Sequence, residues 1–257
     1  MDAVNLNRRI AGAGTAADAW RGDARLAAVR TAGIEELVPP GARVVVVAPH
    51  PDDEILACGG LLQLADRAPL LVAVTDGEAS HPGSPAWPPE RLRATRPDET
   101  RAALACLGIE RPVMLRLGIA DGGVTAAEAD LAQRLGQVLE AGDVVVTTWR
   151  YDGHPDHEAT ARACAAAAAQ CGARLLEAPV WGWHWSAPED GAMPLAQARK
   201  LVLPPEVQAR KRAAMACFQS QVLPDPSRGA AAVVSAPALA RVLNPFELYF
   251  HDTARAL

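Results

Sequence analysis

Hydrophobic residues along the chain are grouped in short continuous runs, separated by longer segments with helical character. The runs are rich in valine and leucine and have the length of strands that are buried on both faces. They cover residues 44–48, 70–75, 113–117, 144–148 and 174–180. The segments between them predict helices at 53–65, 89–108, 125–140 and 159–170. This alternation predicts an α/β fold, a Rossmann-like and mostly parallel sheet with helices on both faces.

The two ends of the chain carry a different pattern. Residues 15–37 predict a surface helix that leads into the first strand, and residues 204–219 predict an amphipathic helix. Residues 246–250 predict a last strand, antiparallel and at an edge of the sheet. Pro97 falls inside the helix at 89–108, where we expect a kink or a restart.

This pattern predicts a single domain that spans the whole chain, residues 1–257. We expect it to consist of an N-terminal helical extension (1–40), an α/β core (41–180) and a C-terminal portion (181–257). The C-terminal portion is expected to complete both the sheet and the site.

Composition narrows the class of protein. The chain of 257 residues is half hydrophobic and has a formal net charge of -5, so we expect no nucleic-acid partner. Its five cysteines form no C-x-x-C pair, which favours buried free thiols in a reducing compartment. Neither a signal-peptide pattern nor a run of roughly 20 apolar residues is present, so the sequence predicts a cytoplasmic location and no membrane span.

The most informative polar cluster follows the first valine run directly, as Pro49-His-Pro-Asp-Asp-Glu54. The prolines stop the strand and stiffen the turn, which delivers one histidine and three carboxylates to the carboxyl edge of the sheet. So many acids in one turn repel each other unless a cation lies among them. Glycines 59 and 60 follow, and we expect close helix–sheet packing there in preference to phosphate binding.

A second cluster repeats the same order of elements. The strand at 144–148 is followed by Tyr151-Asp-Gly-His-Pro-Asp-His-Glu158 and then by an alanine-rich helix. Histidine and aspartate suit a catalytic zinc site, which uses three protein ligands and leaves one position for water. The residues alone permit several assignments of ligand and base among His50, Asp52, Asp53, His154 and His157. Cys58 could also be a ligand, although packing in the first helix is the better interpretation.

On the motifs Ala48-Pro-His-Pro-Asp-Asp-Glu54 and His154-Pro-Asp-His157, the chain resembles the PIG-L/LmbE family of zinc-dependent N-acetylglucosamine deacetylases. Weaker matches lie at 75–78, 96–99 and 117–122. The resemblance implies that the single domain is a deacetylase domain in which His50, Asp53 and His157 bind one Zn²⁺ per chain. It also implies that Asp52 is the general base.

The same resemblance implies roles for further side chains. His154 would stabilise the oxyanion as an imidazolium, with Asp156 orienting the ring and keeping it charged. Arg96 would contact the substrate and Asp121 would bind sugar hydroxyls. The alternatives are a solvated helix charge for Arg96 and a turn-forming aspartate for Asp121.

These observations predict a hydrolase that removes an N-acetyl group from an amino sugar carried by a small molecule or glycoconjugate. One alternative is a zinc amidase acting on a larger amide, and another is a non-catalytic Rossmann-like domain that binds a sugar or nucleotide without metal. The same ligands also accommodate iron(II), manganese and cobalt.

Two segments leave their roles open. The loop at 76–89 is either a lid or a passive surface loop. Trp181, Trp183 and Trp185, if they alternate on a strand, could form a stacking wall for a sugar, although core packing is favoured for at least one of them.

Overall fold

The computed structural model describes residues 8–251, which contain a seven-stranded sheet in the order β3-β2-β1-β4-β5-β7-β6. The strands are β1 (Val44–Ala48), β2 (Leu70–Ala73), β3 (Val113–Arg116), β4 (Val144–Thr148), β5 (Arg174–Ala178), β6 (Ala198–Val202) and β7 (Phe246–His251). Strands β1 to β5 pair in parallel, and β7 pairs antiparallel with both β5 and β6. The predicted α/β class, with a mostly parallel sheet and an antiparallel strand near the C-terminus, is confirmed.

One detail of the sheet differs from the prediction. Strand β7 is antiparallel as expected, but it lies between β5 and β6. The strand at this edge of the sheet is therefore β6. The sequence of β6 gives little signal, because Arg199 and Lys200 stand side by side where a strand with one solvated face would alternate.

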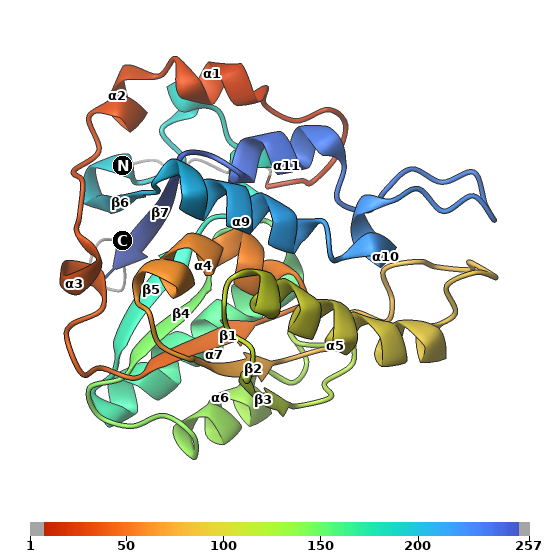
Figure 1. The fold of residues 1–257 in the computed structure, drawn as a ribbon, viewed down its shortest axis with the longest axis horizontal. Helices are drawn as coiled ribbons and strands as arrows, with labels where there is room; N and C mark the ends of the chain where they lie inside the picture. The colour runs from red at the N-terminus through yellow and green to blue at the C-terminus, as the bar shows by residue number, and fades with distance from the viewer. Residues whose placement is uncertain (1–7, 252–257) are drawn as a thin grey trace.

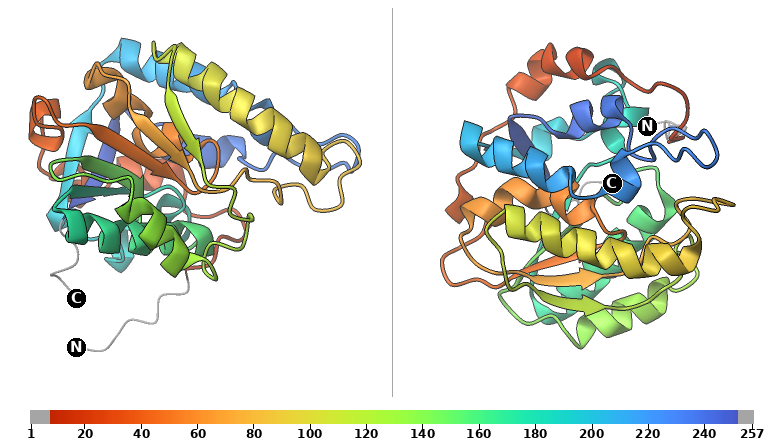
Figure 2. Two further views of the ribbon diagram at one scale, coloured as in Figure 1. Left: turned by 90° about the horizontal axis from the view of Figure 1, so that it is seen from below. Right: turned by 45° about the vertical axis from the view of Figure 1, so that its right-hand side comes forward.

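The long helices cover the sheet in two groups. Helices α4 (Asp53–Leu64), α5 (Pro89–Cys106) and α9 (Pro205–Met215) lie on one side, and α6 (Glu128–Gly136) and α7 (Pro155–Cys171) lie on the other (Figures 1 and 2). Strand β1 explains the two layers, because successive side chains of a strand point to opposite faces. Val44 and Val46 pack in the cluster that includes α4, α5 and α9 residues, whereas Val45 and Val47 pack with residues of α6 and α7.

Residues 15–37 do not form the single helix that was predicted. They form the short helices α1 (Ala17–Arg21), α2 (Ala24–Ala27) and α3 (Ile34–Leu37). The side chain of Asp23 caps α2 by accepting a hydrogen bond from the Leu26 amide, which ends α1 and starts a new turn. Thr31 then forms an isolated bridge with Lys200 of β6. The remaining short elements are α8 (Gly182–Trp185), α10 (Gln219–Val222), α11 (Ala236–Val242) and two single 3₁₀ turns, η1 (Pro188–Asp190) and η2 (Leu195–Gln197).

Pro97 does not interrupt α5, which is assigned as one continuous helix from Pro89 to Cys106. A proline lacks the N–H that would bond the carbonyl four residues earlier. That carbonyl belongs to Arg93, and the Arg116 guanidinium donates to it at 3.3 Å. The freed acceptor therefore has a partner, which explains why the helix continues.

A buried ion pair fastens β7 to α4 and α9. Glu247 accepts from Lys211 Nζ at 2.5 Å and from the Gly60 and Leu61 amides at 2.6 and 2.8 Å. The helical geometry of α4 is broken just before this point, at Cys58. A Cβ atom on Gly60 would lie 2.5 Å from the side chain of Leu203, so only glycine allows this approach. The glycine pair therefore serves close packing, as predicted.

Across residues 8–251, no helix has the length and apolar character that crossing a membrane requires.

Candidate metal centre and active site

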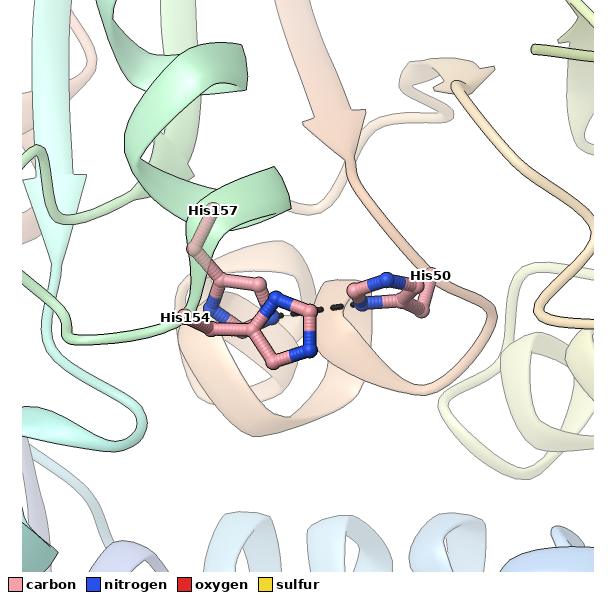
Figure 3. A group of neighbouring side chains, drawn as sticks. All are labelled: His50, His154 and His157. Carbon is pink, nitrogen blue, oxygen red and sulfur yellow. Dashed lines mark hydrogen bonds between the residues drawn. The ribbon is translucent and has the colours of Figure 1, made fainter. Parts of the chain in front are cut away.

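The two histidine–aspartate motifs meet at the centre of the sheet. Strands β1 and β4 are neighbours, and the chain order reverses between them, which is the switch point where open α/β sheets bind ligands. The turn from β1 into α4 carries His50, Asp52 and Asp53, and the turn from β4 into α7 carries His154 and His157. Figure 3 shows the three histidine rings facing one another from these two turns.

Three ligand atoms converge on one point. The Oδ2 atom of Asp53 lies 3.2 Å from His50 Nδ1 and 3.2 Å from His157 Nε2, and the two nitrogens are 3.3 Å apart. A tetrahedral zinc site with bonds of roughly 2.0–2.1 Å separates its ligands by about 3.3 Å. The three side chains therefore fit a divalent metal ion. The nitrogens of His50, His154 and His157 form a wider group, within 4.8 Å of one another.

The second ring nitrogen of His50 faces two carboxylates. His50 Nε2 lies 3.2 Å from Asp121 Oδ1 and 3.3 Å from Asp156 Oδ2, and these three residues also form a group of potential ligands. Carboxylates that flank one imidazole nitrogen hold a proton on it, which leaves the other nitrogen as a ligand. His50 is thereby oriented with Nδ1 toward Asp53 and His157.

Asp52 lies beside this centre in a strained conformation. Its φ of 122° falls in a region that non-glycine residues rarely adopt, and such strain is concentrated at functional sites. Burial raises the pKa of Asp52 to about 8, with added repulsion from Asp53 and Glu54, although Arg96 attracts the ionised form. A carboxylate whose pKa lies near neutral pH is suited to accept a proton.

Arg96 is buried against Asp52, not solvated on the helix surface. Its Nη2 atom lies 3.3 Å from Asp52 Oδ2, and its guanidinium also donates to the carbonyls of Gly77 and Pro51. The side chain is only 2% exposed. The interpretation of Arg96 as a solvated helix charge is therefore wrong, and its contact with a substrate stays a prediction.

Two of the three predicted metal ligands, Asp53 and His157, have pKa values displaced in opposite directions. Burial raises the pKa of Asp53, but attraction to His157 and hydrogen bonds from His157 and His50 outweigh it and hold the pKa far below its usual range. Burial lowers the pKa of His157, but Asp53 and Asp152 outweigh it and raise the pKa to about 9. The carboxylate of Asp53 is thus ionised throughout the neutral range, as a metal ligand must be.

His154 caps the N-terminus of α7, and its surroundings differ from those expected. Its Nδ1 atom accepts the Asp156 amide at 3.2 Å. Burial lowers the pKa of His154 to about 3, and the nearby His157 and His50 rings add to that effect, although Asp53 and Asp156 oppose it. Asp156 thus favours the cationic ring but does not outweigh burial and the two other rings, and a cationic His154 during catalysis stays a prediction.

The carboxylate of Asp156 turns toward other partners. It accepts the amides of Gly122 at 2.7 Å and Val124 at 3.2 Å, and its Oδ2 atom faces His50. Asp156 therefore links the loop after β3 to the His50 ring, and its backbone amide donates to the ring of His154. Its predicted role in catalysis stays a prediction.

Asp121 is also engaged within the chain. Oδ1 faces His50, and Oδ2 accepts the Ala79 amide at 2.9 Å. These contacts link the loop after β2 to the metal centre. Hydrogen bonding of Asp121 to sugar hydroxyls stays a prediction.

A pocket of about 180 Å³ opens onto this centre. Its polar side carries the histidines and aspartates, and its apolar side is formed by Leu56, Trp181, Val233 and Val234. Larger hollows of about 540, 580 and 620 Å³ exist elsewhere, but none of these three is lined by a residue of the two motifs. The pocket at the switch point is therefore the candidate active site.

The three clustered tryptophans do not form a wall. Residues 182–185 form helix α8, not a strand, so their side chains point in different directions. Trp181 lines the pocket, whereas Trp183 packs edge-on against Trp20 at 5.2 Å. Trp185 stacks on Trp149 with a ring separation of 5.9 Å. Core packing is thus confirmed for Trp183.

Two loops that are distant in sequence lie side by side at the mouth of the pocket (Figure 1, gold and blue). Residues 79–88 carry Ser80, and Gln221 of α10 approaches its hydroxyl at 3.4 Å. Further out, the Arg228 guanidinium donates to the Pro82 carbonyl. The loop predicted at 76–89 therefore contributes to the rim of the site.

Sequence reasoning missed some members of the site. Val233, Val234 and Gln221 come from a segment without a readable motif. Asp152 was also overlooked, although its carboxylate lies 2.8 Å from His157 Nδ1. Its position between β4 and His154, inside the second motif, is the signal that could have identified it.

Comparison with known proteins agrees with this geometry. Residues 45–168 match the family model described as "PIG-L: GlcNAc-PI de-N-acetylase". This segment contains both histidine–aspartate motifs, and over it the chain is similar to the PIG-L family. Together with the group of potential metal ligands, this match supports an N-deacetylase of the metal-dependent hydrolase class. No curated protein matches the chain by sequence.

Solved structures share the fold. The zinc-inhibited form of teicoplanin deacetylase Orf2 is 22% identical, with a TM-score of 0.58, over 71% of this chain and 85% of that one. N,N'-diacetylchitobiose deacetylase from Pyrococcus horikoshii is 18% identical, with a TM-score of 0.57, over 74% of each chain. The conserved protein TT1542 from Thermus thermophilus is 26% identical, with a TM-score of 0.52, over 71% of this chain and 80% of that one.

Proposed function

We propose that this chain is a zinc-dependent hydrolase that removes the acetyl group from an N-acetylated amino sugar in a GlcNAc-type glycoconjugate. The observation that carries the proposal is the convergence of His50 Nδ1, Asp53 Oδ2 and His157 Nε2 within 3.3 Å, beside the buried carboxylate of Asp52. The family description names a GlcNAc-PI de-N-acetylase. Two proteins of the same fold are a teicoplanin deacetylase and an N,N'-diacetylchitobiose deacetylase.

His50, Asp53 and His157 would hold the metal. Two imidazole nitrogens and one carboxylate oxygen are a ligand set that zinc accepts readily, and their spacing suits its tetrahedral geometry. When bound, the metal supplies Lewis acidity, which favours loss of a proton from water and polarises an amide carbonyl.

Asp52 acts as the general base. It accepts a proton from the water that attacks the amide carbonyl, and it then delivers that proton to the leaving amine. Its location on the pocket wall and its pKa of about 8 suit both steps. Arg96 keeps the carboxylate in place from the buried side at 3.3 Å.

His154 donates a hydrogen bond to the oxyanion as a neutral ring. Because its Nδ1 atom accepts the Asp156 amide, the proton of the neutral imidazole lies on Nε2. A preorganised donor stabilises the charge that develops in the transition state, whether or not it carries a charge itself. Arg96 and Asp121, at the polar side of the pocket, are proposed to bind the sugar.

An assay for released amine tests the proposal. Purified protein with zinc is incubated with N-acetylglucosamine, a nucleotide sugar, a GlcNAc glycolipid and a GlcNAc pseudodisaccharide, and free amine and acetate are quantified. We expect both products in equal amounts from at least one substrate. Release of amine only from larger non-acetyl amides would favour the amidase instead.

Asp52→Asn is the matched control, because it preserves shape and removes the base. The variant should bind zinc as the wild type does, while its kcat falls by about 10²–10⁴-fold. A protein that binds no zinc, releases no amine and yet retains sugar affinity in both forms would be the non-catalytic binding domain, and would contradict the proposal.

A further inference from the structure

We propose that Asp152 is a positioning residue for the metal centre, which fixes the proton on His157 and at the same time holds the apolar wall of the pocket. The inference rests on the metal site of the proposed function, but its test requires no substrate. Asp152 is completely buried, with an exposed fraction of 0%.

The first part of the argument is the contact with His157. Asp152 Oδ2 lies 2.8 Å from His157 Nδ1, and the opposite ring nitrogen, Nε2, faces Asp53 and His50. A carboxylate can only accept a hydrogen bond, so Nδ1 must carry the proton. The lone pair is then on Nε2, where a metal ligand is needed.

The second part is the anchoring of Asp152 itself. Its Oδ1 atom accepts the amides of Val180 at 2.9 Å and Gly182 at 2.8 Å, and Oδ2 accepts the Trp181 amide at 2.9 Å. Three consecutive amides thus fix the carboxylate, so its direction toward His157 is set by the backbone that follows β5.

The same hydrogen bonds also hold the backbone that forms one wall of the pocket. Trp181 lies on the apolar side of the pocket, and its backbone is held to Asp152. The indole of Trp185 adds a bond to the Asp152 carbonyl at 2.9 Å. One residue therefore couples the orientation of a metal ligand to the position of the wall that a substrate would contact.

Asp152→Asn separates this role from simple packing, because it changes one acceptor to a donor at almost constant volume. Two amides donate to Oδ1, so the amide oxygen of asparagine is expected there, and its NH₂ group would face the Trp181 amide and His157 Nδ1. The NH₂ group of asparagine would then face a protonated Nδ1 of His157. Because two donors repel each other, the substitution favours the His157 tautomer with the proton on Nε2. That tautomer cannot bind a metal through Nε2.

The experiment measures zinc affinity by competition with a chromogenic chelator, for protein whose folding is verified by circular dichroism. We expect Asp152→Asn to bind zinc about 10–100-fold more weakly than the wild type. Glu158→Gln is the matched control, because Glu158 follows His157 directly in α7 and accepts hydrogen bonds from Arg8 and the Gly153 amide. Its zinc affinity should equal that of the wild type.

Unchanged zinc affinity in folded Asp152→Asn would overturn the inference and leave Asp152 as a packing residue. If the variant does not fold, a measurement on the wild-type protein still tests the inference. In ¹⁵N-histidine NMR of the zinc-loaded protein, His157 should show a protonated Nδ1 and a metal-bound Nε2. Zinc at Nδ1, or an unprotonated Nδ1, would be incompatible with the inference. Both readouts are independent of deacetylation, so failure of the proposed reaction would be seen separately.

Discussion

The guanidinium of Arg96 lies 3.3 Å from the carboxylate of Asp52, and both side chains are buried at the base of the pocket. Removal of a charged residue from this position changes both the chemistry and the stability of the site. Arg96 lowers the pKa of Asp52, whereas burial and the neighbouring acids raise it to about 8. The ion pair therefore sets the pH range in which Asp52 is ionised.

Arg96→Gln should move the acid limb of the pH–rate profile to higher pH. Without the cation the pKa of Asp52 rises, so a higher pH is needed to ionise its carboxyl group. The carbonyls of Pro51 and Gly77 also lose a donor, at a cost of about 1–3 kcal/mol. The measurements are kcat/KM against pH and urea unfolding. Arg101→Gln, an exposed change in the same helix, is the control and should alter neither the pH–rate profile nor the stability. If the acid limb of Arg96→Gln does not move, Arg96 does not set the pKa of the base.

His154→Ala should lower kcat by about 10²–10³-fold with little change in zinc content or KM, because the donor acts mainly in the transition state. His154→Gln decides whether charge is required. A glutamine amide can donate without a charge, so it should recover part of the lost activity if the ring acts in its neutral form. Activity of His154→Gln as low as that of His154→Ala would instead support an imidazolium.

Removal of zinc should destabilise the folded protein as well as abolish activity. A metal that binds only the folded state stabilises it in proportion to the logarithm of its concentration over Kd, about 4 kcal/mol at a thousandfold excess. Tm should therefore fall on addition of a chelator and recover when zinc is restored. In His157→Ala the chelator should have no effect on Tm. A chelator effect of wild-type size in this variant would exclude His157 as a ligand.

Much of the fold could be predicted because the local sequence pattern and the long-range packing favour the same strands. The run of valines in β1 is buried on both faces, and its predicted range coincides with the strand observed. The same holds for β4, and the two turns that follow these strands carry the metal site. A strong apolar run that ends in a proline turn leaves few alternatives for the direction of the next side chains.

The errors arose where long-range contacts decided the structure. Residues 181–185 alternate as a strand would, yet Asp152 accepts three amides at the start of this segment and holds it in a helical turn. The surroundings of His154 could likewise not be read from its neighbours in sequence, because the ring of His50 lies beside it with a centroid distance of 4.8 Å. Contacts between residues that are well separated in sequence, 28–30 residues in the case of Asp152, leave no local pattern.

The buried pair of Lys211 and Glu247 allows a prediction for stability far from the reaction. Lys211→Met removes the cation and leaves a buried carboxylate with hydrogen bonds but no opposite charge. Breaking one partner of such a pair typically costs about 3–5 kcal/mol. The double variant Lys211→Met/Glu247→Gln should be less destabilised than the sum of its single variants, because no unpaired charge remains. Urea unfolding of zinc-saturated protein measures these free energies. Lys200→Met is the control, since Lys200 is the other lysine of the chain and donates to the Leu26 and Ala27 carbonyls near the surface. If Lys211→Met costs no more than Lys200→Met, the attachment of β7 to α4 depends on packing and not on this ion pair.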